Sequence, residues 1–92
     1  MPRFYAVNPN GHYYNGLKSF GNRYVMKFSL YQMSVLSAND VCQLLTDADK
    51  AEYEESFKPV KELKFFQLDG TEKTIQEIVT IDSEENRPVE QV

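Results

Sequence analysis

The stretch from Arg23 to Tyr31, RYVMKFSLY, alternates between polar and apolar side chains with a period of two. Successive side chains of a β-strand point to opposite sides, so this period predicts a strand with one buried face. The residues expected on that buried face are Tyr24, Met26, Phe28 and Leu30. The stretch therefore indicates a sheet that is covered on one side, and the rest of the chain can be placed around it.

Two turn signals precede this strand. The sequence NPNG at residues 8–11 is a strong turn, because proline presets one φ angle and glycine accepts a positive one. Asn-Gly at residues 15–16 is the favoured two-residue loop of a β-hairpin, although the short strands beside it leave a plain loop as the alternative. We expect residues 3–31 to form an antiparallel meander.

A helical pattern follows over roughly residues 38–57. Ser37 can cap the first turn, and Asp40 lies where the helix dipole favours an anion. A second capping signal at residues 46–49 leaves two alternatives, one kinked helix or two short helices, ended by Pro59. The apolar stripe expected to pack on the sheet is Val41, Leu44, Leu45 and Ala48.

The second half of the chain contains two further strand candidates, joined by a turn at Asp69-Gly70. The first spans residues 60–68. The second spans residues 74–81, where β-branched residues favour a strand and helical spacing leaves a short helix as the alternative. Residues 82–92 are polar and acidic, and we expect them to form a mobile tail.

These elements predict a single α+β domain over residues 1–81. In it, a small antiparallel sheet from residues 3–31 and 60–81 is covered on one face by one kinked or two short helices. A chain of 92 residues is too short for two domains of ordinary size, and its core is thin.

Composition argues against several classes of protein. One cysteine, Cys42, excludes an internal disulfide, and one histidine, His12, argues against Cys/His metal sites and His-based triads. There is no apolar run near the roughly 20 residues that span a bilayer, and no glycine-rich phosphate loop. We therefore expect a cytoplasmic protein, in a host cell if the chain is viral, with no enzymatic activity, cofactor, metal or membrane contact.

Charge divides the chain into two unlike halves. The formal net charge is -4, but residues 1–46 hold four basic residues against one acidic residue, whereas residues 47–92 hold six against thirteen. Such an acidic second half could enter a basic groove on a protein partner, as nucleic acid would; the alternative is a solvated helix face. The acidic residues assigned to partner binding are Asp47, Asp49, Glu52, Glu54 and Glu55.

Aromatic and basic residues are interleaved in the first half. Tyr13, Tyr14 and Arg23 are the members assigned to partner binding. The wider set could stack bases and neutralise phosphates, or simply fill a thin core. Exposed aromatic rings would equally suit a protein partner or a second copy of the chain. The wider set is Arg3, Tyr5, Lys18, Tyr24 and Lys27.

Size, charge and the missing catalytic motifs together predict a small non-enzymatic protein that binds another macromolecule and modulates or inhibits it. In general character the chain resembles the compact accessory and inhibitor proteins of phages and mobile elements, without a motif that assigns a family. The alternative is a nucleic-acid-binding module that uses the basic, aromatic N-terminal sheet.

Overall fold

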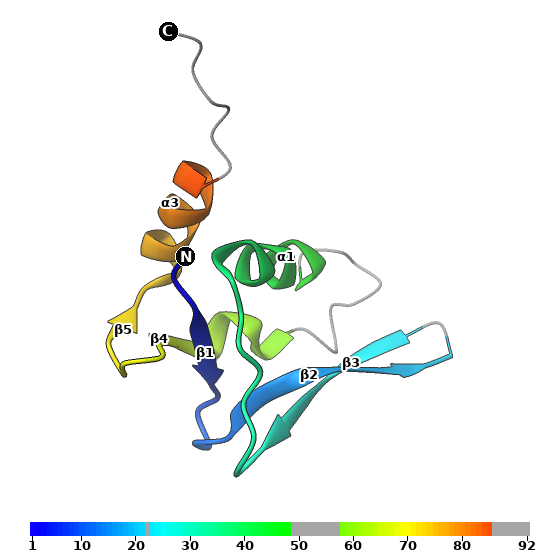
Figure 1. The fold of residues 1–92 in the computed structure, drawn as a ribbon. Coiled ribbons are helices and arrows are strands. Elements are labelled where there is room, and N and C mark those ends of the chain that lie inside the picture. The colour runs from blue at the N-terminus through cyan, green and yellow to red at the C-terminus, as the bar shows by residue number, and fades with distance from the viewer. Residues whose placement is uncertain (22, 49–57, 86–92) are drawn as a thin grey trace, which may run out of the picture.

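The computed structural model describes residues 1–21, 23–48 and 58–85, and within them the predicted α+β arrangement is present (Figure 1). Five antiparallel strands form one sheet in the order β3-β2-β1-β4-β5. In chain order the elements are β1 (Phe4–Val7), β2 (Tyr13–Phe20), β3 (Arg23–Ser29), α1 (Ala38–Ala48), the 3₁₀ helix η2 (Lys58–Glu62), β4 (Lys64–Gln67), β5 (Glu72–Lys73) and α3 (Ile75–Glu85).

The core lies between the sheet and the two α-helices, which pack against each other (Figure 1). The central strand β1 alternates, with Phe4 and Ala6 fully buried and Tyr5 and Val7 half-buried. The predicted stripe of α1 contributes Val41 and Leu44, and β3 contributes Met26. The sheet is thus covered on one face, as expected from the alternation.

The Asn15-Gly16 hairpin prediction is wrong. β2 runs through this dipeptide, and its pairing with β3 shifts register between Tyr14 and Leu17. Gly16 has a φ of 93°, so the conformation that would suit a hairpin loop instead forms a bulge within the strand. β3 begins at Arg23, paired with Phe20 at the end of β2.

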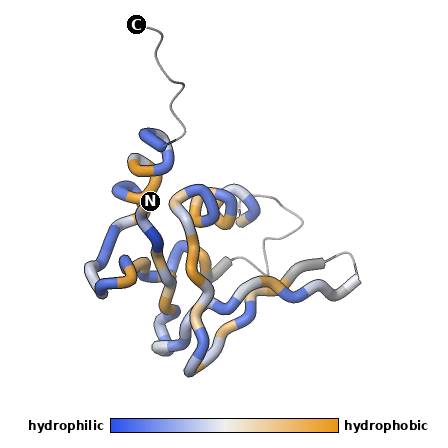
Figure 2. Tube along the Cα trace, in the orientation of Figure 1, coloured by the Kyte–Doolittle hydropathy of each residue, from blue (hydrophilic) through white to orange (hydrophobic). Residues whose placement is uncertain are grey.

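The chain after β3 fills a gap in the sheet. β1 and β2 pair only at Val7 and Tyr13, and beyond that point Leu36 exchanges two backbone hydrogen bonds of 2.8 Å with Phe4. A run of apolar residues here, just before α1, is visible in Figure 2. Leu30, predicted to lie in the core, is 57% exposed, because the strand ends at Ser29.

Helix α1 begins as predicted. The Ser37 hydroxyl accepts the Asp40 N–H at 3.0 Å, and the Asp40 carboxylate accepts the Ser37 N–H at 3.0 Å. This reciprocal pair satisfies two of the N–H groups that a helix start leaves without intrahelical partners. Residues 49–57, the predicted continuation of the helix, lie outside the described residues.

The strand predicted at residues 74–81 is wrong, because the segment is helix α3. Thr74 and Glu77 form a second reciprocal cap, with bonds of 2.9 and 3.1 Å, that begins the helix. The helix continues to Glu85 and includes the first four residues of the predicted acidic tail, while residues 86–92 lie outside the described part of the chain. Ile78 of this helix is fully buried in the core.

The strand predicted over residues 60–68 is shorter than expected. Its first part belongs to η2, which includes Pro59, and only Lys64–Gln67 pair as β4. The predicted turn at residues 69–70 is confirmed, because it joins β4 to β5. No helix among the described residues has the length and apolar character needed to cross a bilayer.

Candidate binding site on the uncovered face of the sheet

The side chains of β1 alternate between the two faces of the sheet. Phe4 and Ala6 point to the helices, so Tyr5 and Val7 point away from them. Pairing extends this arrangement to the neighbouring strands, where Tyr5 lies opposite Phe66 of β4 and Val7 lies opposite Tyr13 of β2. All four side chains are half-buried on the face that the helices leave uncovered.

Three of these side chains form an aromatic cluster, Tyr5, Tyr13 and Phe66, across three strands. The Tyr5 and Phe66 rings are stacked, with centroids 5.4 Å apart and planes 20° apart. The Tyr5 and Tyr13 rings meet edge to face at 5.8 Å and 68°. Such contacts hold the rings in place while they are still partly open to solvent.

A groove of about 510 Å³ lies over this cluster. Its walls are the three rings, Val7, Lys64, Glu62 and the turn at residues 8–11. The Asn8 side chain fixes that turn by accepting the backbone N–H groups of Asn10 and His12 at 3.0 and 2.9 Å. The groove is therefore built from strands and a well-bonded turn.

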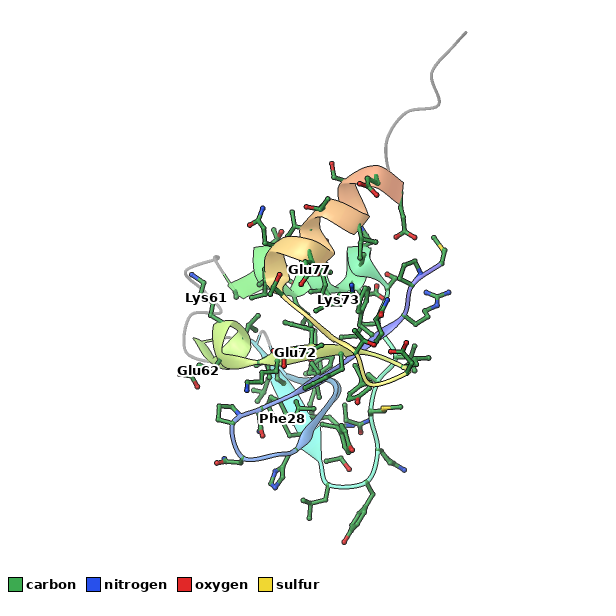
Figure 3. All side chains as sticks on the ribbon, turned by 90° about the vertical axis from the view of Figure 1, so that its left-hand side faces the viewer. Phe28, Lys61, Glu62, Glu72, Lys73 and Glu77 are labelled. Atoms are coloured by element: carbon green, nitrogen blue, oxygen red, sulfur yellow. The ribbon has the colours of Figure 1, made fainter. Side chains whose placement is uncertain are left out.

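The groove carries one charge of each sign. Lys64 lies opposite Val7 on β4, and Glu62 lies at the end of η2, two residues earlier. Both side chains are exposed, and Figure 3 shows Glu62 pointing outward from η2. The rim can thus make polar contacts with a ligand of either charge, above an apolar and aromatic floor.

The helix layer is acidic by comparison with the sheet face. Acidic side chains are distributed along both helices, and Glu77 forms an ion pair with Lys73 at 3.6 Å at the start of α3 (Figure 3). The acidic residues of α1 and α3 are Asp40, Asp47, Glu77, Asp82, Glu84 and Glu85.

Two groups near the helices have raised pKa values. Burial, with a smaller effect from the Asp40 and Asp47 carboxylates, raises the pKa of Tyr14 to about 12. Burial also raises the pKa of Cys42 to about 11, assisted by a hydrogen bond with Asp82. Both groups are protonated at neutral pH, so the Cys42 thiol is a poor nucleophile.

The residues predicted to bind a partner are separated by the structure. Tyr13 is in the groove, whereas its neighbour Tyr14 is buried on the helix side, because adjacent strand residues face opposite ways. Asp47 lies near the end of α1, where it accepts a hydrogen bond from Gln43 at 3.0 Å. Arg23 begins β3, and nothing is described of its side chain.

The other four predicted acidic residues lie outside the described part of the chain: Asp49, Glu52, Glu54 and Glu55.

Sequence reasoning missed Phe66, Lys64 and Glu62 as members of a site. One signal was available, because Phe65 and Phe66 are adjacent in a strand and cannot both face the core. Nothing in the sequence shows that β4 lies next to β1 and so brings Phe66 against Tyr5.

Within residues 1–21, 23–48 and 58–85, no three Asp, Glu, His or Cys side chains are grouped as a metal site would require. Comparison with protein-family models, curated proteins and solved structures finds no match to this chain.

Proposed function

We propose that this is a non-enzymatic protein that binds a protein partner through the uncovered face of its sheet and thereby modulates or inhibits that partner. The observation that supports this proposal is the aromatic cluster of Tyr5, Tyr13 and Phe66 beside a groove. Tyrosine and phenylalanine are favoured at protein interfaces, because they bury a large area at low entropic cost. An accessory or inhibitory role in the cytoplasm, of the phage or mobile-element type, is part of this proposal.

Exposed apolar side chains are also present outside the groove. Val35, which precedes the buried Leu36, is 51% exposed. Leu68, in the turn that follows β4, is also half-exposed. Large exposed apolar areas on small proteins commonly mark sites of interaction.

A pull-down with tagged protein from native host lysate tests the proposal. We expect the wild type to retain a stoichiometric protein partner with and without nuclease, and the double variant Tyr13→Ser, Phe66→Ser to lose it. The control is Val79→Ser, which removes a comparably exposed apolar side chain from α3 and should retain the partner.

Equal recovery with all three proteins would exclude the sheet face as the site. Recovery that disappears with nuclease would favour the alternative, a nucleic-acid-binding module, for which the rings would stack bases and Lys64 would contact phosphate.

A further inference from the structure

We propose that the groove binds a cationic side chain, arginine in particular, presented by a basic segment of the protein partner. This inference rests on the proposed function and specifies the chemistry of the same face. It follows from three features: the rings of the groove, the position of Glu62, and the charge of the whole chain.

The floor of the groove suits a cation. Tyr5, Tyr13 and Phe66 come together from three strands, with neighbouring centroids 5.4 and 5.8 Å apart. Aromatic faces attract a guanidinium or ammonium group within about 6 Å of the ring centre. Arginine gains most here, because its planar and weakly hydrated guanidinium also stacks on rings.

The rim supplies a matching anion. Glu62 is exposed, but its backbone is held between Val60 and Leu63, which are 0% and 5% exposed and joined by a hydrogen bond of 3.2 Å from the Leu63 N–H to the Val60 carbonyl. The carboxylate therefore extends from a fixed position at the edge of the groove. A carboxylate can accept two parallel hydrogen bonds from one guanidinium.

The charge of the chain favours a basic partner. The formal net charge of the whole chain is -4. The resulting field accelerates association with a positively charged segment and disfavours nucleic acid. The positive charge of Lys64 repels a bound cation, but its long aliphatic stem can cover apolar surface while its ammonium group stays in solvent.

Fluorescence anisotropy with a labelled oligo-arginine peptide tests the inference, with oligo-glutamate and oligothymidylate as comparison probes. We expect oligo-arginine to bind, and Glu62→Gln to weaken that binding by about three- to five-fold. Tyr5→Leu keeps an apolar side chain but removes the ring, so it should weaken binding by about three- to ten-fold. Lys64→Gln should tighten it.

The matched control is Glu84→Gln, which makes the same charge change in the last turn of α3. Equal weakening by Glu62→Gln and Glu84→Gln would show attraction to the whole chain and would overturn the groove assignment. Unfolding curves measured for every variant separate a lost contact from a lost fold.

Other outcomes distinguish the inference from the proposed function. Oligothymidylate binding that is weakened by Lys64→Gln and tightened by Glu62→Gln would overturn both in favour of nucleic acid. Partner loss in the Tyr13→Ser, Phe66→Ser protein without any groove-dependent binding of oligo-arginine would overturn the inference alone. Concentration-dependent dimerisation abolished by Tyr5→Leu would identify a second copy as the occupant and would also overturn it.

Discussion

Tyr13 and Tyr14 are neighbours in β2, and their rings lie on opposite faces of the sheet. The Tyr13 ring meets Tyr5 on the uncovered face at 5.8 Å, and the Tyr14 ring meets Phe28 on the helix side at 6.3 Å. Tyr14 is only 4% exposed. The strand thus assigns one tyrosine to the surface and the other to the core, although their local sequence is almost the same.

Alanine substitutions of these two tyrosines should have unequal effects on stability. Tyr14→Ala removes a buried ring and should lower the free energy of unfolding by about 3–5 kcal/mol. Tyr13→Ala removes a half-buried ring and should cost about 1 kcal/mol. Urea denaturation followed by circular dichroism measures both, and equal losses would contradict the assignment of the two faces.

Alkaline pH should destabilise the protein through Tyr14. Its pKa is raised from 10.0 to about 12, mainly by burial, so the folded state keeps the proton that the unfolded state releases. Stability should therefore be lost as the pH rises from about 10 to 12, with a slope of up to about 1.4 kcal/mol per pH unit.

Tyr14→Phe removes this titration and keeps the ring. The free energy of unfolding of this variant should fall less steeply over the same pH range than that of the wild type. Parallel curves of unfolding free energy against pH for the two proteins would show that other groups cause the loss of stability at alkaline pH.

The features predictable from sequence were those specified by local chemistry. The alternation after Arg23, the cap at Ser37 and the turn at residues 69–70 each depend on residues close together in the chain. The predictions failed where one local sequence pattern is compatible with two structures. Asn15-Gly16 fits a hairpin or a bulge, and only the pairing of β2 with β3 decides between them.

The α3 segment is a second such case. Its β-branched residues favoured a strand, but Thr74-x-x-Glu77 is a capping-box pattern that sequence alone could have revealed. The groove could not be predicted in this way, because it requires β4 to lie beside β1. Strand order depends on contacts between distant parts of the chain. Neither the hydrophobic period nor the secondary-structure propensity of a segment encodes these contacts.

Substitution of Gly16 in the bulge should lower the stability of the protein. Its φ of 93° is costly for residues with a Cβ, although the nearest atom, the Ser34 Oγ, would be 3.9 Å from such a Cβ. Gly16→Ala should therefore cost about 1–2 kcal/mol through backbone strain alone. Gly16→Asn should cost less, since asparagine tolerates this region better. Urea denaturation tests the order, and an Asn variant less stable than the Ala variant would contradict it.

The cap of α3 should contribute measurably to stability. Thr74→Ala removes the hydroxyl that accepts the Glu77 N–H at 3.1 Å, and should lower the free energy of unfolding by about 1 kcal/mol. Ser83→Ala is the control, because it removes a hydroxyl from an exposed position inside the same helix and should be neutral or slightly stabilising. Equal effects of the two changes in urea denaturation would argue against the cap.

Acidic pH should weaken the same cap. The pKa of Glu77 is held below its usual 4.5, first by the Thr74 N–H, then by the Thr74 hydroxyl, and further by Lys73. A lowered carboxyl pKa contributes stability that is complete above the usual value and is lost as the pH falls below it. Glu77→Gln should therefore flatten the dependence of unfolding free energy on pH below about 4.5. Glu84→Gln changes the charge of the same helix away from the cap and should leave that dependence close to the wild type. A Glu77→Gln protein that loses stability in acid as steeply as the wild type would show that the carboxylate does not support the start of α3.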